Sequence, residues 1–253
     1  MTEPSRREFL VSASASSAGL LLAGLTTNAA SQEASQAGAA SRPAAAFAAT
    51  HQAKPLPFDP AKMHGFSENI IRSHWENNYG GAVKTLNAVK QQLAAALANK
   101  DTPPFAYNDL KREHLLRTGS VIFHELYFDN LGGDGKADGE VRKHIADAFG
   151  DFESWETEFR RIGVGLGGGS GWVVLGYNLH LGQIENYWLW DHLHAPAATL
   201  PLLVMDMYEH AYQMDFGAAA AKYVEVFFQN IQWNVVGARF AQARRFKAAE
   251  LPA

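Results

Sequence analysis

Two helix-length segments separated by a pair of prolines leave few ways to fold the first half of this chain. Between residues 67 and 99, apolar residues recur mostly at three- and four-residue steps, the spacing of one face of an α-helix. A second such run, residues 108–129, follows Pro103 and Pro104, which end the first unit. Because the connector is short, the two runs predict an antiparallel helical hairpin.

The second half predicts a different architecture. Helical patterns occur at about 140–149, 152–162 and 218–246. Strand-like apolar segments lie between them, at residues 172–177, 183–190 and 202–205. The predicted fold class is therefore α+β: an N-terminal antiparallel helical hairpin followed by a C-terminal domain of helices on a small three-stranded antiparallel sheet.

The N-terminus has the features of a targeting sequence. Arg6 and Arg7 precede a weakly apolar, serine-rich run that ends in small residues near Ala30. This order is typical of a cleaved twin-arginine signal peptide. The run is too short and too polar to be a good spanning helix, so no stable membrane anchor is expected. We expect export by the twin-arginine route to a periplasmic or extracellular location.

The predicted organisation has four segments. They are a twin-arginine signal peptide (1–30), a flexible Ala/Ser linker (31–55), a helical hairpin domain (56–133) and an α+β domain (134–253).

Composition and two glycine-rich segments exclude several kinds of site. The chain has no cysteine and a net charge of −4, which excludes thiolate chemistry and gives no basic surface for nucleic acid. In the segment 131–140, Lys136 occupies a position where an EF-hand needs a calcium ligand, so an EF-hand site is excluded. Residues 163–168 match GxGxxG, but a helix precedes them and a strand follows, so a dinucleotide site is excluded.

Four side chains could form a metal site. His74 and His124 lie on the two helices of the predicted hairpin, Asp206 ends the apolar segment LLVMD, and His210 follows four residues later. Three imidazoles and one carboxylate suit Fe, Mn, Zn or Cu better than calcium or magnesium. Spacing alone leaves ordinary structural roles open for each residue. The nearby pair His192 and His194 precedes a proline in a loop, where a surface role is expected.

Several segments resemble the iron/manganese superoxide dismutases over about residues 54–246. DMYEHAY is similar to that family's D-x-W-E-H-A-Y signature, with Tyr208 in place of tryptophan. The segments GGGSGWVVLGYN, NIQWNVVGARF and KPLPFDP resemble its GSGW segment, its C-terminal helix and its entry motif.

The resemblance implies a superoxide dismutase with one Fe or Mn ion per subunit, held by His74, His124, Asp206 and His210. It also implies a fifth ligand from solvent, superoxide as the substrate, and a homodimer in which Glu209 reaches the partner's copy of the fourth ligand. Around the metal, the expected catalytic residues are Tyr79, Trp172, Tyr208 and Glu209.

The chain departs from the family around the metal. The glutamine that usually holds the solvent ligand comes from one of two places, which are Ser120 and Gly168 here. The usual entrance tyrosine and histidine correspond to Ala82 and Asn78, and the tyrosine that pairs with that histidine corresponds to Gln213. Asn78 and Gln213 carry amides that could still bond each other, and Tyr79 could supply the missing phenol.

These departures leave the choice between Fe and Mn open, and they leave two rival functions. One rival is a metal-binding protein on the same fold that turns over poorly or not at all. The other is a mononuclear oxygenase, which usually has two histidines and one carboxylate, so a third histidine argues against it.

Overall fold

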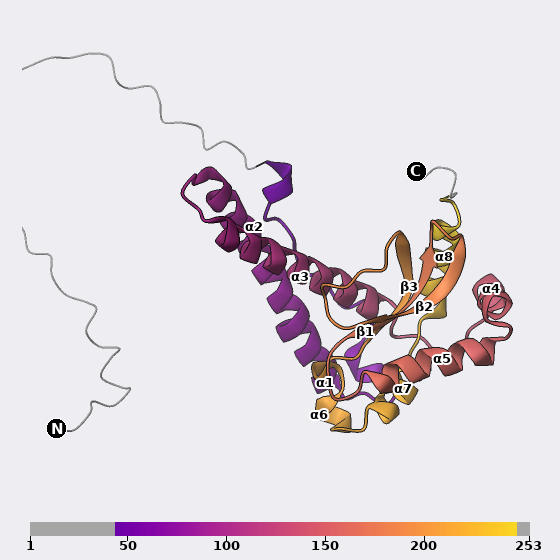
Figure 1. Ribbon diagram of the computed structural model, residues 1–253. Helices are drawn as coiled ribbons and strands as arrows, with labels where there is room; N and C mark the ends of the chain where they lie inside the picture. The colour runs from indigo at the N-terminus through magenta and orange to yellow at the C-terminus, as the bar shows by residue number, and fades with distance from the viewer. Residues whose placement is uncertain (1–43, 247–253) are drawn as a thin grey trace, which may run out of the picture. The chain divides into compact units, whose positions relative to one another are not determined.

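A computed structural model describes residues 44–246 and shows the predicted hairpin (Figure 1). The first arm contains α1 (Glu68–Ser73), a π-helical turn (His74–Tyr79) and α2 (Gly80–Ala98), and the second arm is α3 (Pro104–Asp129). Ser67 caps α1 by accepting a hydrogen bond from the Ile70 amide at 3.2 Å. Pro104 begins α3 instead of ending a unit, because the first helical position tolerates proline.

The C-terminal part has the predicted α+β architecture. Its elements are α4 (Gly139–Phe149), α5 (Phe152–Gly165), β1 (Trp172–Asn178), β2 (Gln183–Leu189), β3 (Thr199–Asp206), α6 (Gln213–Phe216), α7 (Ala220–Gln229) and α8 (Trp233–Ala243). The sheet is antiparallel in the order β2-β1-β3, and α3, α5 and α8 contact it. Its register places Trp172 beside Asp206, which brings two predicted site residues together.

The helix predicted at 218–246 is instead two helices, α7 and α8. Between them, the Asn230 side chain bonds the backbone of His64, accepting from its amide at 2.9 Å and donating to its carbonyl at 2.8 Å. The Gln232 amide donates to the Asn130 carbonyl at 2.9 Å. The backbone therefore leaves the helix because tertiary hydrogen bonds replace helical ones.

Residues 48–54, which the sequence analysis placed in the linker, lie along the hairpin. The His51 amide donates to the side chain of Asn87 at 3.1 Å, and the Lys54 amide donates to the Tyr79 hydroxyl at 2.8 Å. Glu125 accepts hydrogen bonds from His51 and Tyr79, each at 3.0 Å. Polar contacts hold this stretch against the hairpin. The sequence analysis placed it in the linker because it has few large apolar side chains.

Among the described helices, none combines the length and apolar character that a membrane crossing requires.

One buried asparagine joins the hairpin to the edge of the sheet. Asn130, directly after α3, donates to the Val204 carbonyl at 3.1 Å and accepts from the Val204 amide at 2.9 Å. Val204 lies on β3, an edge strand whose outer backbone groups would otherwise lack these partners. Asn130 is fully buried, so water cannot replace it.

We expect Asn130→Ala to destabilise the fold by about 2 kcal/mol, because it leaves buried backbone groups unpaired. For a domain of this size, that corresponds to a thermal midpoint roughly 4–8 °C lower. Thermal unfolding followed by circular dichroism measures the shift. Asn108→Ala, an exposed position on the same helix, is the control. Equal midpoints for the two variants would contradict the role of Asn130.

Candidate metal centre

Four side chains from four separate elements converge between the hairpin and the sheet. His74 begins the π-helical turn, His124 lies on α3, Asp206 ends β3, and His210 lies in the 3-10 turn Glu209–Ala211. One potential ligand atom from each lies within 4.8 Å of the others. The sequence analysis predicted this set, and the structure brings all of its members together.

The Asp206 carboxylate is the centre of the cluster. Its Oδ2 lies 3.1 Å from His74 Nε2, 3.2 Å from His210 Nε2 and 3.6 Å from His124 Nε2. Its Oδ1 accepts a hydrogen bond from the Tyr208 amide at 2.8 Å. One oxygen is therefore fixed by the backbone of the turn, while the other faces the three imidazoles.

Backbone contacts orient the Asp206 residue as well. The Tyr223 hydroxyl on α7 donates to the Asp206 carbonyl at 2.6 Å. Both residues are fully buried, so this contact joins α7 to the end of β3 away from water. The carboxylate direction is thus set by the strand, by the turn that follows and by a helix behind it.

His124 provides the clearest test of whether these residues fit a metal. Its Nδ1 donates to the Ser120 carbonyl at 2.7 Å, so the neutral ring carries its lone pair on Nε2. That Nε2 atom is buried and has no hydrogen-bond partner among the described residues. A buried polar atom without a partner is costly, and a metal ion at the centre of the cluster would satisfy it. The residues fit the ion.

The protonation states also suit metal binding. Burial lowers the pKa of His74 and brings the pKa of His124 well below its usual value. Burial opposes ionisation of Asp206, but the neighbouring His210 and His74 hold the pKa of that carboxyl below its usual value. The neutral rings of His74 and His124 beside an ionised carboxylate are in the state that a metal requires of its ligands.

The predicted catalytic residues occupy different surroundings. Trp172 is fully buried, and its indole donates to His192 Nδ1 at 3.0 Å. The Tyr208 ring is stacked against the His210 ring, with centroids 5.2 Å apart. Glu209 is exposed in the single chain.

Tyr79 is buried, but its hydroxyl is used in the contacts with Lys54 and Glu125. Burial raises the pKa of Tyr79 to about 12. Its ring lies 6.3 Å from the His124 ring, measured between centroids. The phenol is therefore near the centre, while its hydroxyl bonds to groups outside the four-residue cluster.

The positions at which the sequence analysis expected departures from the family pattern have a structural context. Ser120 is buried one turn before His124, and its hydroxyl lies 3.3 Å from His124 Nδ1. Gly168 has a φ of 78°, a backbone conformation that strains a residue with a side chain. Within the described single chain, no hydrogen bond joins Asn78 to Gln213.

His192 is the residue that sequence reasoning missed. Burial lowers the pKa of His192 to about 4, so the expected surface role is wrong for this residue. Its ring stacks on Tyr208, with centroids 4.5 Å apart, and lies 5.8 Å from the His124 ring. His194 is exposed, as expected. The HxH spacing signalled a histidine pair but not which member turns inward.

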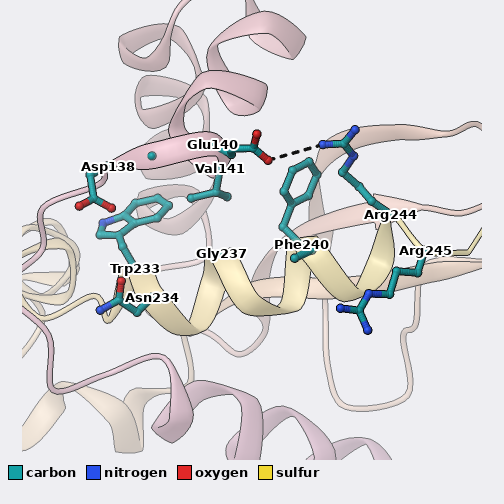
Figure 2. Close-up of a pocket in the computed structure, with 11 residues that line it drawn as sticks. Asp138, Glu140, Val141, Trp233, Asn234, Gly237, Phe240, Arg244 and Arg245 are labelled. Carbon is teal, nitrogen blue, oxygen red and sulfur yellow. Dashed lines mark ion pairs between the residues drawn. The ribbon is translucent and has the colours of Figure 1, made fainter.

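A separate surface pocket lies between the start of α4 and the length of α8 (Figure 2). Across it, Glu140 Oε2 and Arg244 Nη1 form an ion pair at 3.8 Å. No member of the four-residue cluster lines this pocket. An exposed ion pair of this kind contributes little to stability, and the pocket provides no comparable ligand set.

Comparisons with known proteins show the family of this chain. A family profile described as "Iron/manganese superoxide dismutases, C-terminal domain" matches residues 137–239. An iron superoxide dismutase from Cupriavidus metallidurans is 51% identical over 195 residues, which cover 77% of this chain and 98% of the relative. The chain belongs to the iron/manganese superoxide dismutase family.

More distant relatives are named either iron or manganese superoxide dismutases. An iron superoxide dismutase from Aquifex aeolicus is 31% identical over 193 residues, covering 74% of this chain and 89% of the relative. Superoxide dismutase [Mn] 2 from Haloferax volcanii is 28% identical over 200 residues, covering 77% of this chain and 97% of the relative. Family membership makes the chain an oxidoreductase of the superoxide dismutase class that uses iron or manganese.

Proposed function

We propose that His74, His124, Asp206 and His210 hold the one Fe or Mn ion of a subunit and that superoxide dismutation takes place there. The observation that carries this proposal is the approach of four potential ligand atoms to within 4.8 Å of one another. The unpartnered Nε2 of His124 supports it independently.

The chemistry that a bound Fe or Mn ion supplies is the passage of one electron. One superoxide gives up the electron and leaves as dioxygen, while a second accepts it with two protons and leaves as hydrogen peroxide. The protein's own contribution is charge and orientation. Asp206 places one negative charge beside three imidazoles, and Ser120 holds the His124 ring in the tautomer that presents Nε2.

Replacing any one of the four residues by alanine tests the ligand set. We expect at least a tenfold loss of bound iron or manganese and of dismutase activity, because each replacement removes a direct ligand. Elemental analysis and a cytochrome c reduction assay are made on the same sample. His180→Ala, an exposed histidine in the β1–β2 turn, is the control.

The same experiment separates the rival functions. Wild-type protein that binds metal stoichiometrically but has no dismutase activity would favour the inactive metal-binding protein. Loss of metal at only three of the four positions would favour an oxygenase-type ligand set.

We also propose a homodimer in which Glu209 reaches His210 of the partner subunit. Glu209 is exposed in the single chain, and the adjacent His210 side chain is 24% exposed at the edge of the metal centre. A shared edge of this kind would cover both residues. The proposal otherwise rests on the resemblance to the family.

We expect Glu209→Arg to shift the protein from dimer toward monomer, because it places a cation against the partner's histidine. Analytical ultracentrifugation over a concentration series measures the shift. Glu225→Arg, an exposed glutamate on α7, makes the same charge change elsewhere and should leave the mass unchanged. A dimer of wild-type strength in Glu209→Arg would contradict the proposed interface.

Export by the twin-arginine route, to the periplasm or beyond the cell, is proposed from the sequence. The signal segment lies outside the described residues. Changing Arg6 and Arg7 together to lysine should leave uncleaved protein in the cytoplasm, since this route recognises the arginine pair. Cell fractionation with immunoblotting measures this, with Arg161→Lys as the control. Normal export of the double variant would contradict the route.

A further inference from the structure

Residues 48–54, here called the strap, end in a lysine that contacts both arms of the hairpin. The Lys54 carbonyl accepts a hydrogen bond from the Trp75 indole at 2.9 Å, and the Lys54 amide donates to the Tyr79 hydroxyl at 2.8 Å. Both partners belong to the π-helical turn of the first arm. The Lys54 ammonium pairs with Glu125 on α3, at 2.5 Å between Nζ and Oε2. One residue thus uses its amide, its carbonyl and its side chain to join the two arms.

These contacts lie one residue away from two of the proposed metal ligands. Trp75 directly follows His74, and Glu125 directly follows His124. The two histidines come from opposite arms, and the centroids of their rings are 5.0 Å apart. Their separation therefore depends on how the arms are held together at this level, which is where Lys54 joins them.

Glu125 is the half of this ion pair that water hardly reaches. Its side chain is 11% exposed, and it also accepts hydrogen bonds from His51 and Tyr79, each at 3.0 Å. A carboxylate with so little exposure is costly to bury without partners, so the loss of one partner weakens the whole group. The Lys54 side chain is 62% exposed, and solvent therefore reduces its contribution.

The backbone of the rest of the strap bonds to the first arm. The His51 amide and carbonyl bond to the Asn87 side chain at 3.1 and 2.8 Å, and the Lys90 ammonium donates to the Ala48 carbonyl at 3.3 Å. These partners lie on α2, past the π-helical turn that carries the ligand. Lys90 is therefore a lysine that contacts the same strap but is not adjacent to a proposed ligand.

We propose that Lys54 is a positioning residue that keeps the two arms of the hairpin closed around the metal and slows its release. It acts through Trp75 and Glu125, the residues that follow the two hairpin ligands. Opening of the arms would draw the imidazoles of His74 and His124 apart, because they lie on different arms. The inference rests on the proposed function, since it assumes that this ligand set holds the ion.

Lys54→Met in the iron-loaded full chain tests the inference, because it removes the ammonium and keeps the backbone contacts of the strap. We expect iron loss to excess EDTA to become about fivefold faster, near the upper limit for an ion pair with one exposed partner. Elemental analysis of desalted samples over time measures the rate. Lys54→Arg keeps the charge and should lose iron at close to the wild-type rate.

A second variant tests the partner of Lys54. Glu125→Gln removes the negative charge and keeps an acceptor for Tyr79, so it should speed iron loss about as much as Lys54→Met. The double variant should be no faster than either single one, because the two residues act as a pair.

A matched control separates positioning from general support by the strap. Lys90→Met makes the same change at the strap contact on α2 and should lose iron at the wild-type rate. Far-UV circular dichroism of the iron-loaded variants should equal that of the wild type, which shows that each is folded when its rate is measured.

The inference is overturned if folded Lys54→Met and Glu125→Gln both lose iron at the wild-type rate. It is also overturned if Lys90→Met speeds iron loss as much as Lys54→Met does, because the strap would then give only general support. Failure of the proposed ligand set is distinguishable. Wild-type protein would then hold no iron, or would keep it after His74→Ala, and both proposals would fall.

Discussion

A carboxylate without solvent exposure, that of Asp206, is the group around which this fold is organised. Burying such a charge is costly unless other groups compensate for it. Here the compensation comes from both halves of the chain. The hairpin supplies His74 and His124, while the turn after β3 supplies the Tyr208 amide and His210. The contacts that assemble the metal centre therefore also join the hairpin to the end of β3.

Much of this arrangement could be predicted from local patterns. The period of the apolar residues predicted the hairpin, and short apolar segments between the helical patterns predicted the strands of the sheet. The break at Asn230 could not be predicted, because it depends on bonds to His64, 166 residues away in sequence. The spacing of the apolar residues also gave no indication of the π-helical turn at His74. Such turns are frequent at functional sites.

The surroundings of the metal were harder to predict than its ligands. Four ligands are recognisable because their chemistry restricts the residue types. His192 was missed because its position depends on Trp172 and on the space left by Gly119, which only the folded chain brings together. At Ser120 and Gly168, where the sequence analysis expected the family's glutamine, this chain carries no amide side chain. The structure places the His192 imidazole beside the ligands, with its ring centroid 5.8 Å from that of His124.

Crystals of the metal-loaded protein, with anomalous diffraction recorded at both the iron and the manganese absorption edges, test the central claim most directly. The ligand set predicts one strong anomalous peak per subunit, bonded to His74, His124, Asp206 and His210. Diffraction at the two edges also identifies the metal. A folded, active protein without a peak at these four residues, or with its peak elsewhere, would contradict the claim.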